Sequence, residues 1–146
     1  MRRNVNASAE FFKAVGIEGP VFNDYNIGNY LIFHLFPKER VFIDNRPEAY
    51  PTDFLKDVYN TMLTREDVWR RYEALYHLNV IYFDRRDHGP GVQEFLWRRV
   101  LDPEWIEVYV DDFAIIFLKD NEKNQKIIRR FQLPPAMFNM RYRRMS

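Results

Sequence analysis

The sequence predicts an α/β fold: a three-layer sandwich whose mostly parallel sheet has about five strands and a C-terminal antiparallel hairpin. Two short apolar runs, Pro20–Phe22 and Val41–Ile43, each end in a polar cluster and are separated by a segment of helical length that stops at Pro37. This pattern is typical of a strand, a crossover helix and a parallel strand. The continuous apolar run Val80–Phe83 indicates a sheet covered on both faces.

The first half of the chain is predicted to alternate helices and strands. Asn6 is a suitable N-cap for the first helix, and Gly16 suits the position just after its end. Pro37 ends the second helix, and the β-branched and aromatic residues that follow favour a strand. The predicted elements are a helix over Ala7–Val15, a strand over Val21–Asn23, a helix over residues 26–36 and a strand over Arg40–Asp44.

The second half predicts helices that begin near Thr52 and at Thr64, where hydroxyl side chains can cap them. A third strand, a helix, two strands and a last helix follow. The two-residue link Asp111–Asp112 between long apolar runs indicates a hairpin. These later elements are expected over Asn79–Asp84, Val92–Leu101, Trp105–Val110, Phe113–Lys119 and residues 121–131.

Composition indicates one globular domain over residues 1–131 and a basic tail over residues 132–146. Hydrophobic residues make up 47% of the 146 residues and charged residues 29%. The absence of cysteine excludes disulfides, thiol nucleophiles and cysteine-based metal sites. No apolar run reaches the ~18 residues of a membrane span, and no signal peptide is evident. A chain of this kind from a membrane protein would therefore be an excised piece.

The balance of charge is uneven along the chain. The net charge is +1, which argues against a general nucleic-acid binder, so no nucleic-acid partner is expected. The last eighteen residues nevertheless hold five arginines and no acid, which leaves the remainder mildly acidic. The tail is either a solvated end or a contact with nucleic acid or with anionic lipid, the lipid contact being made by Arg141, Arg143 and Arg144.

Acidic side chains follow the predicted strands. Asp24 and Asp44 come after the first two, and Asp84 follows the third. If these carboxylates share one edge of the sheet, they can hold a magnesium ion for phosphoryl transfer or hydrolysis. The alternative is that they cap helices or pair with Arg46, Arg85 or Arg86. No phosphate-binding glycine motif accompanies them, and the three histidines lack the spacing of a zinc site, so no cofactor and no metal is expected.

The same edge carries the other candidate ligand residues. Arg46 either forms a structural ion pair in a loop bounded by prolines or contacts a phosphate or sugar phosphate. The rings of Tyr25 and Tyr30 either stack on a sugar at this edge or belong to the core. No Gly-x-Ser-x-Gly motif is present, so no serine nucleophile and no catalytic residue is assigned. The candidate ligand set is Asn23, Asp24, Tyr25, Tyr30, Asp44 and Arg46.

Two linked segments carry a resemblance to a known family. They are Gly19–Tyr25 with Gly28 and Tyr30–Ile32, and Val41–Arg46 with Tyr50–Pro51. Together with the closing hairpin, over roughly residues 6–119, the chain resembles the soluble C-terminal domain of GT-C type multi-pass membrane glycosyltransferases, related to the dolichyl-phosphate-mannose protein mannosyltransferases. A looser likeness links Asn23–Tyr25 to the Trp-Trp-Asp-Tyr-Gly segment of oligosaccharyltransferase catalytic subunits, without its tryptophans.

The resemblance implies an extracytoplasmic domain that follows the last membrane span. The catalytic acids of that family lie in a loop that this chain lacks, so the implied role is accessory and non-catalytic. The implied partners are the transmembrane part of the parent protein and a sugar or acceptor substrate. The basic tail departs from this expectation, because positive charge usually gathers on the cytoplasmic side. The alternative from a different class is a small stand-alone magnesium-dependent enzyme that uses the strand-end aspartates.

Overall fold

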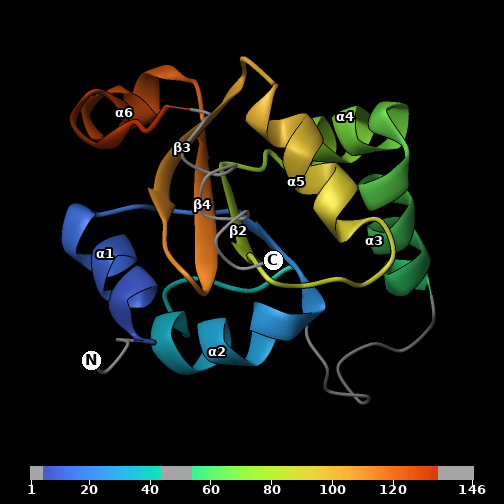
Figure 1. Cartoon of the computed structure of the whole chain (residues 1–146), viewed down its shortest axis with the longest axis horizontal. Helices are drawn as coiled ribbons and strands as arrows, with labels where there is room; N and C mark the ends of the chain where they lie inside the picture. The colour runs from blue at the N-terminus through green and yellow to red at the C-terminus, as the bar shows by residue number, and fades with distance from the viewer. Residues whose placement is uncertain (1–4, 44–53, 135–146) are drawn as a thin grey trace.

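A computed structural model describes residues 5–43 and 54–134 and confirms the α/β class. Its sheet has the order β1-β2-β4-β3, with strands Val21–Asn23, Val80–Asp84, Trp105–Val110 and Ala114–Lys119 numbered along the chain (Figure 1). β1 pairs in parallel with β2, whereas β4 is antiparallel to both β2 and β3. The described sheet is therefore mixed and four-stranded, and the predictions of about five strands and of mostly parallel pairing are wrong.

Helices cover both faces of this sheet, as Figure 1 shows. The side chains of Phe22, Ile81, Phe83 and Phe117 point to one face and form a core with three helices, α3 (Phe54–Thr64), α4 (Glu66–Leu75) and α5 (Val92–Val100). Their neighbours along the strands point to the other face and form a second core with α1 (Ala7–Val15), α2 (Tyr25–Leu35) and α6 (Gln125–Phe131). The apolar run of β2 supplies residues to both cores, which explains why that strand does not alternate with polar residues.

The helix boundaries fall close to those that the sequence predicts. Gly16 adopts the left-handed conformation expected after α1, with φ of 79°, and its N–H caps the helix end. Asn6 occupies the N-cap position but makes no side-chain capping bond. The helices are α1 Ala7–Val15, α2 Tyr25–Leu35, α3 Phe54–Thr64, α4 Glu66–Leu75, α5 Val92–Val100, η2 Glu122–Asn124 and α6 Gln125–Phe131.

The predicted strand over Arg40–Asp44 is not formed in its described part, residues 40–43. The backbone there is held by a side chain. The Asn23 carboxamide accepts a hydrogen bond from the N–H of Phe42 at 2.6 Å and donates one to the carbonyl of Ile43 at 2.6 Å. The chain turns into α2 directly after Asn23, where β1 ends. The Asn23 side chain, rather than a further strand, therefore links the end of β1 to residues 42 and 43. The parallel partner of β1 is β2, not this segment.

The predicted C-terminal hairpin is confirmed as β3 and β4. Asp111 organises its turn, because its Oδ1 accepts hydrogen bonds from the N–H groups of Phe113 at 2.7 Å and Ala114 at 2.8 Å. The turn is thus a side-chain-stabilised loop of three residues. Within the described ranges, no helix has both the length and the apolar character that crossing a bilayer demands.

Candidate functional site

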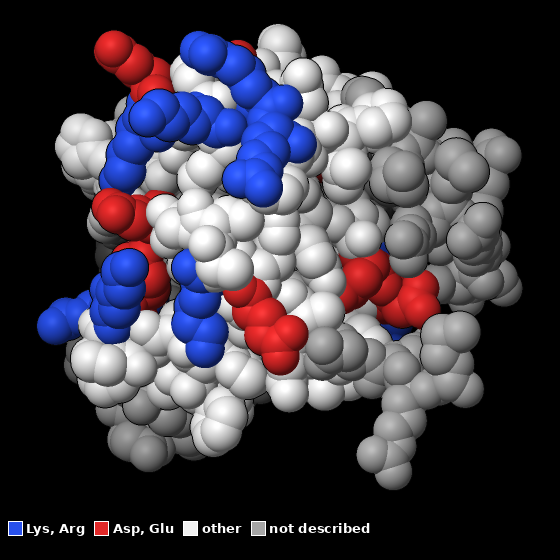
Figure 2. Space-filling model, turned by 90° about the vertical axis from the view of Figure 1, so that its left-hand side faces the viewer, with Lys and Arg blue, Asp and Glu red and all other residues white. Residues whose placement is uncertain are grey.

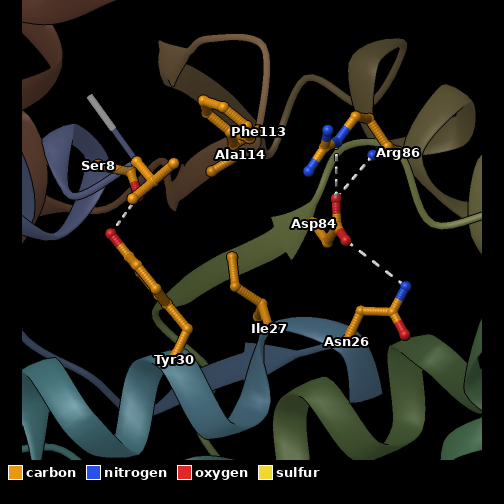
Figure 3. Close-up of a pocket in the computed structure, with 9 residues that line it drawn as sticks. Ser8, Asn26, Ile27, Tyr30, Asp84, Arg86, Phe113 and Ala114 are labelled. Carbon is orange, nitrogen blue, oxygen red and sulfur yellow. Dashed lines mark hydrogen bonds and ion pairs between the residues drawn. The ribbon is translucent and has the colours of Figure 1, made fainter. Parts of the chain in front are cut away.

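A cavity of about 230 Å³ opens where β1 and β2 end (Figure 3). In open α/β sheets, ligands bind outside the carboxyl ends of parallel strands, and this cavity occupies that position. Its volume lies below the range of pockets for drug-sized molecules, so a single sugar ring or a similarly small polar group suits it. Nine residues from four stretches of the chain line it: Val5, Ser8, Asn26, Ile27, Tyr30, Asp84, Arg86, Phe113 and Ala114.

One side of the cavity carries a group of charged and amide side chains centred on Asp84. Its Oδ1 accepts a hydrogen bond from the N–H of Arg86 at 2.9 Å, and the Arg86 Nε lies 3.8 Å away. Asn26, in the first turn of α2, points its Nδ2 toward Asp84 Oδ2 at 3.5 Å, as Figure 3 shows. The Arg86 side chain is about half exposed and the Asp84 side chain is less so. These groups offer both donors and acceptors to a ligand.

The opposite side of the cavity carries hydroxyl groups. Tyr30 rises from α2 toward Ser8 in α1, and their hydroxyl oxygens lie 3.3 Å apart. Ser8 also contacts the hydroxyl of Tyr82, which lies on β2. The ring of Phe113 closes the top, with the guanidinium carbon of Arg86 4.7 Å from its centroid. The cavity therefore combines an aromatic face, two polar ends and an apolar floor.

Asp24 lies beneath this edge and is fully buried. Its Oδ1 accepts a hydrogen bond from the N–H of Asp84 at 3.0 Å, which ties the end of β1 to the end of β2. Its Oδ2 meets no donor, but it faces the carboxylate of Asp87. Burial, and then the neighbouring Asp87, raise the pKa of Asp24 well above its ordinary value. Burial thus favours the protonated form of Asp24, and the bond to the N–H of Asp84 gives this side chain a structural role.

The predicted candidate residues divide into four groups. Tyr30 lines the cavity. Asn23 and Asp24 are fully buried below it, and their side chains form hydrogen bonds with the backbone of neighbouring segments. Tyr25 belongs to the other face of the sheet, where its ring lies 5.1 Å from that of Tyr59. The remaining two candidates, Asp44 and Arg46, lie outside the described residues.

Replacing Asn23 with alanine is expected to lower the free energy of unfolding by about 2–3 kcal/mol. The change leaves the N–H of Phe42 and the carbonyl of Ile43 without the amide that now satisfies them. Urea unfolding measures the loss, and hydrogen exchange should show that the Phe42 amide loses its protection. Asn29→Ala on the exposed face of α2 is the matched control and should change stability little. Equal stability of the two variants would refute the role assigned to Asn23.

Most of the cavity was missed by sequence reasoning. Asp84 was considered because it follows a strand, and Arg86 only as its partner. Ser8 and Phe113 gave no signal, because the first sits in a helix and the second in a hairpin turn far along the chain. The strand order that brings them to one edge is a property of the whole topology. In the described part of the chain, no group of three or more histidine, aspartate or glutamate side chains is placed to hold a metal ion.

No protein-family model, curated protein or solved structure matches this chain.

Proposed function

We propose that this chain is an accessory, non-catalytic domain of a GT-C-like membrane glycosyltransferase, and that the cavity at the ends of β1 and β2 binds a sugar of the donor or acceptor. In this proposal the domain lies outside the cytoplasm and rests on the transmembrane part of its parent. A three-layer sandwich is the proposed architecture, supported by cores on both faces of the sheet. The observation that carries the proposal is the set of lining groups.

Those groups suit a sugar better than a nucleotide or an apolar ligand. A sugar ring presents neighbouring hydroxyls, which the carboxylate of Asp84 and the guanidinium of Arg86 can bind as acceptor and donor. Its less polar face can lie against an aromatic ring, and Phe113 supplies one. The hydroxyls of Ser8 and Tyr30 offer further hydrogen bonds at the other end.

Magnesium-dependent chemistry at the strand-end aspartates is the rival function, and no observation favours it. A metal ligand must be deprotonated, whereas burial raises the pKa of Asp24 and favours its protonated form. We expect no magnesium-stimulated hydrolysis of p-nitrophenyl phosphate by the chain. Turnover that needs magnesium and that Asp44→Asn abolishes would show that the rival function is right.

The proposal is tested by titrating the full chain with methyl α-mannoside in a calorimeter. Saturable binding is expected, and Arg86→Ala should weaken it at least about tenfold, because a charged hydrogen-bond partner is lost. Arg65→Ala is the matched control, since Arg65 is an exposed arginine that pairs with Asp67 away from the cavity. No binding by the unaltered chain, or equal loss in both variants, would overturn the proposal.

A further inference from the structure

We propose that the C-terminal end of α2 forms a peripheral binding site for a bilayer that contains anionic phospholipid. Phe33 and Phe36 lie three residues apart on α2 and just beyond its end, and their side chains are 83% and 61% exposed. Single exposed apolar residues are common on protein surfaces, but two exposed aromatic residues at the same helix end offer a larger apolar surface, which marks a contact. This patch is not used by the cavity described above.

Two lysines lie near Phe36. A second cavity, of about 340 Å³, lies between the end of α1 and the end of α2 beside Phe36. Its rim carries Lys13 and Lys38, both exposed, and its floor is apolar. Neither lysine has an ion-pair partner in the described part of the chain. Glu39, the acid that also lines this cavity, is engaged by the N–H of Gly19.

The exposed aromatic rings and the two lysines together indicate which kind of partner fits this surface. The cores of protein–protein interfaces are depleted in lysine, so two unpaired lysines beside the rings argue against a protein surface. An anionic bilayer attracts lysine and arginine to its headgroups and accepts aromatic rings at its interface. His34, which also lines the cavity, contacts both Tyr30 and Phe33 through its ring. Burial, and then the charge of Lys13, lower its pKa, so at neutral pH the cationic groups of the site are the lysines.

More basic groups lie on the same side of the molecule. Figure 2 looks onto the side where α1 and α6 lie and shows Lys and Arg side chains both at its top and in its lower half. The last turn of α6 contributes Arg129 and Arg130, which are exposed. Their charge adds a longer-range attraction toward an anionic surface, although the contact itself is assigned to α2.

Sedimentation with vesicles tests this inference. The full chain should bind vesicles of phosphatidylcholine mixed with phosphatidylglycerol and bind vesicles of phosphatidylcholine alone at least about tenfold more weakly. The double variant Phe33→Ser and Phe36→Ser should lower the partition coefficient into mixed vesicles about tenfold or more, since two inserted rings are lost. Lys13→Gln with Lys38→Gln should lower it by a similar factor and reduce its dependence on salt.

The control is Leu101→Ser, because Leu101 is 77% exposed but follows α5 on the other side of the sheet. It should bind vesicles as the unaltered chain does. Equal binding to both vesicle types, or full binding by the Phe33 and Phe36 variant, would overturn the inference. So would loss of binding on replacement of Arg141, Arg143 and Arg144 alone, which would assign the contact to the tail. Methyl α-mannoside binding should be unchanged in the Phe33 and Phe36 variant, so the two proposals can fail separately.

Discussion

Phe22→Ala is expected to lower the free energy of unfolding by about 3–5 kcal/mol, the usual cost of removing a fully buried aromatic side chain. Phe22 has no exposed surface and is the central residue of β1. Five other rings lie within 6 Å of its own, centroid to centroid: Phe42, Tyr59, Trp69, Phe83 and Phe95. A three-residue strand has few ladder bonds, so this packing is what fixes β1 against β2 and α3–α5.

Urea unfolding of the unaltered chain and of Phe22→Ala provides the comparison. Phe33→Ala is the matched control, because it removes the same atoms from an exposed site and should change stability by no more than about 0.5 kcal/mol. The cavity should also be lost in Phe22→Ala at urea concentrations that leave the control folded, since β1 pairs with β2, whose last residue, Asp84, lines the cavity. A loss of less than about 1 kcal/mol would contradict the central place of Phe22 in the core.

The second large effect is a stability that falls as the pH rises. Glu107 on β3 is 4% exposed, and neither of its carboxylate oxygens has a hydrogen-bond partner. Burial raises its pKa to about 8, against an opposing effect of Arg85. Between the ordinary value of 4.5 and about 8, the folded protein holds a proton that the unfolded chain has released. The free energy of unfolding therefore falls across this window, by roughly 5 kcal/mol in total.

Glu107→Gln should remove this dependence, because an amide is neutral at every pH in the window. The unaltered chain should lose much more stability than the variant when urea unfolding is repeated from about pH 5 to about pH 8. All other titrating groups, including Asp24, are common to both proteins, so the difference between the two curves isolates Glu107. Parallel curves would show that Glu107 is ionised in the folded protein and that its burial is compensated.

Continuous apolar runs and turn residues predicted the parts of the fold that depend on local pattern. Val80–Phe83 was predicted as a strand covered on both faces, and the hairpin was predicted from the acidic link between two apolar runs; both are present. The run Val41–Ile43 has the same local character but forms no strand. Its backbone groups bond to the Asn23 side chain, and local pattern cannot distinguish that partner from a neighbouring strand.

The site was predicted less completely than the fold. The sequence predicted ligand groups at the carboxyl ends of strands, and Tyr30 and Asp84 line the cavity found there. It treated Asn23 and Asp24 as exposed ligand groups because polar residues at strand ends are often accessible. Their burial results from the cover that α2 and the segment before residue 44 place over them, and from the meeting of Asp24 with Asp84 and Asp87. These are long-range contacts that no motif encodes.

The most direct test of the proposed sugar site is a map of amide chemical shifts in the ¹⁵N-labelled full chain during titration with methyl α-mannoside. Saturable shifts are expected at residues around the cavity, foremost Asn26, Tyr30, Arg86 and Phe113, with little change around the exposed end of α5. Shifts that gather elsewhere, or a spectrum that stays unchanged at saturating sugar, would contradict it.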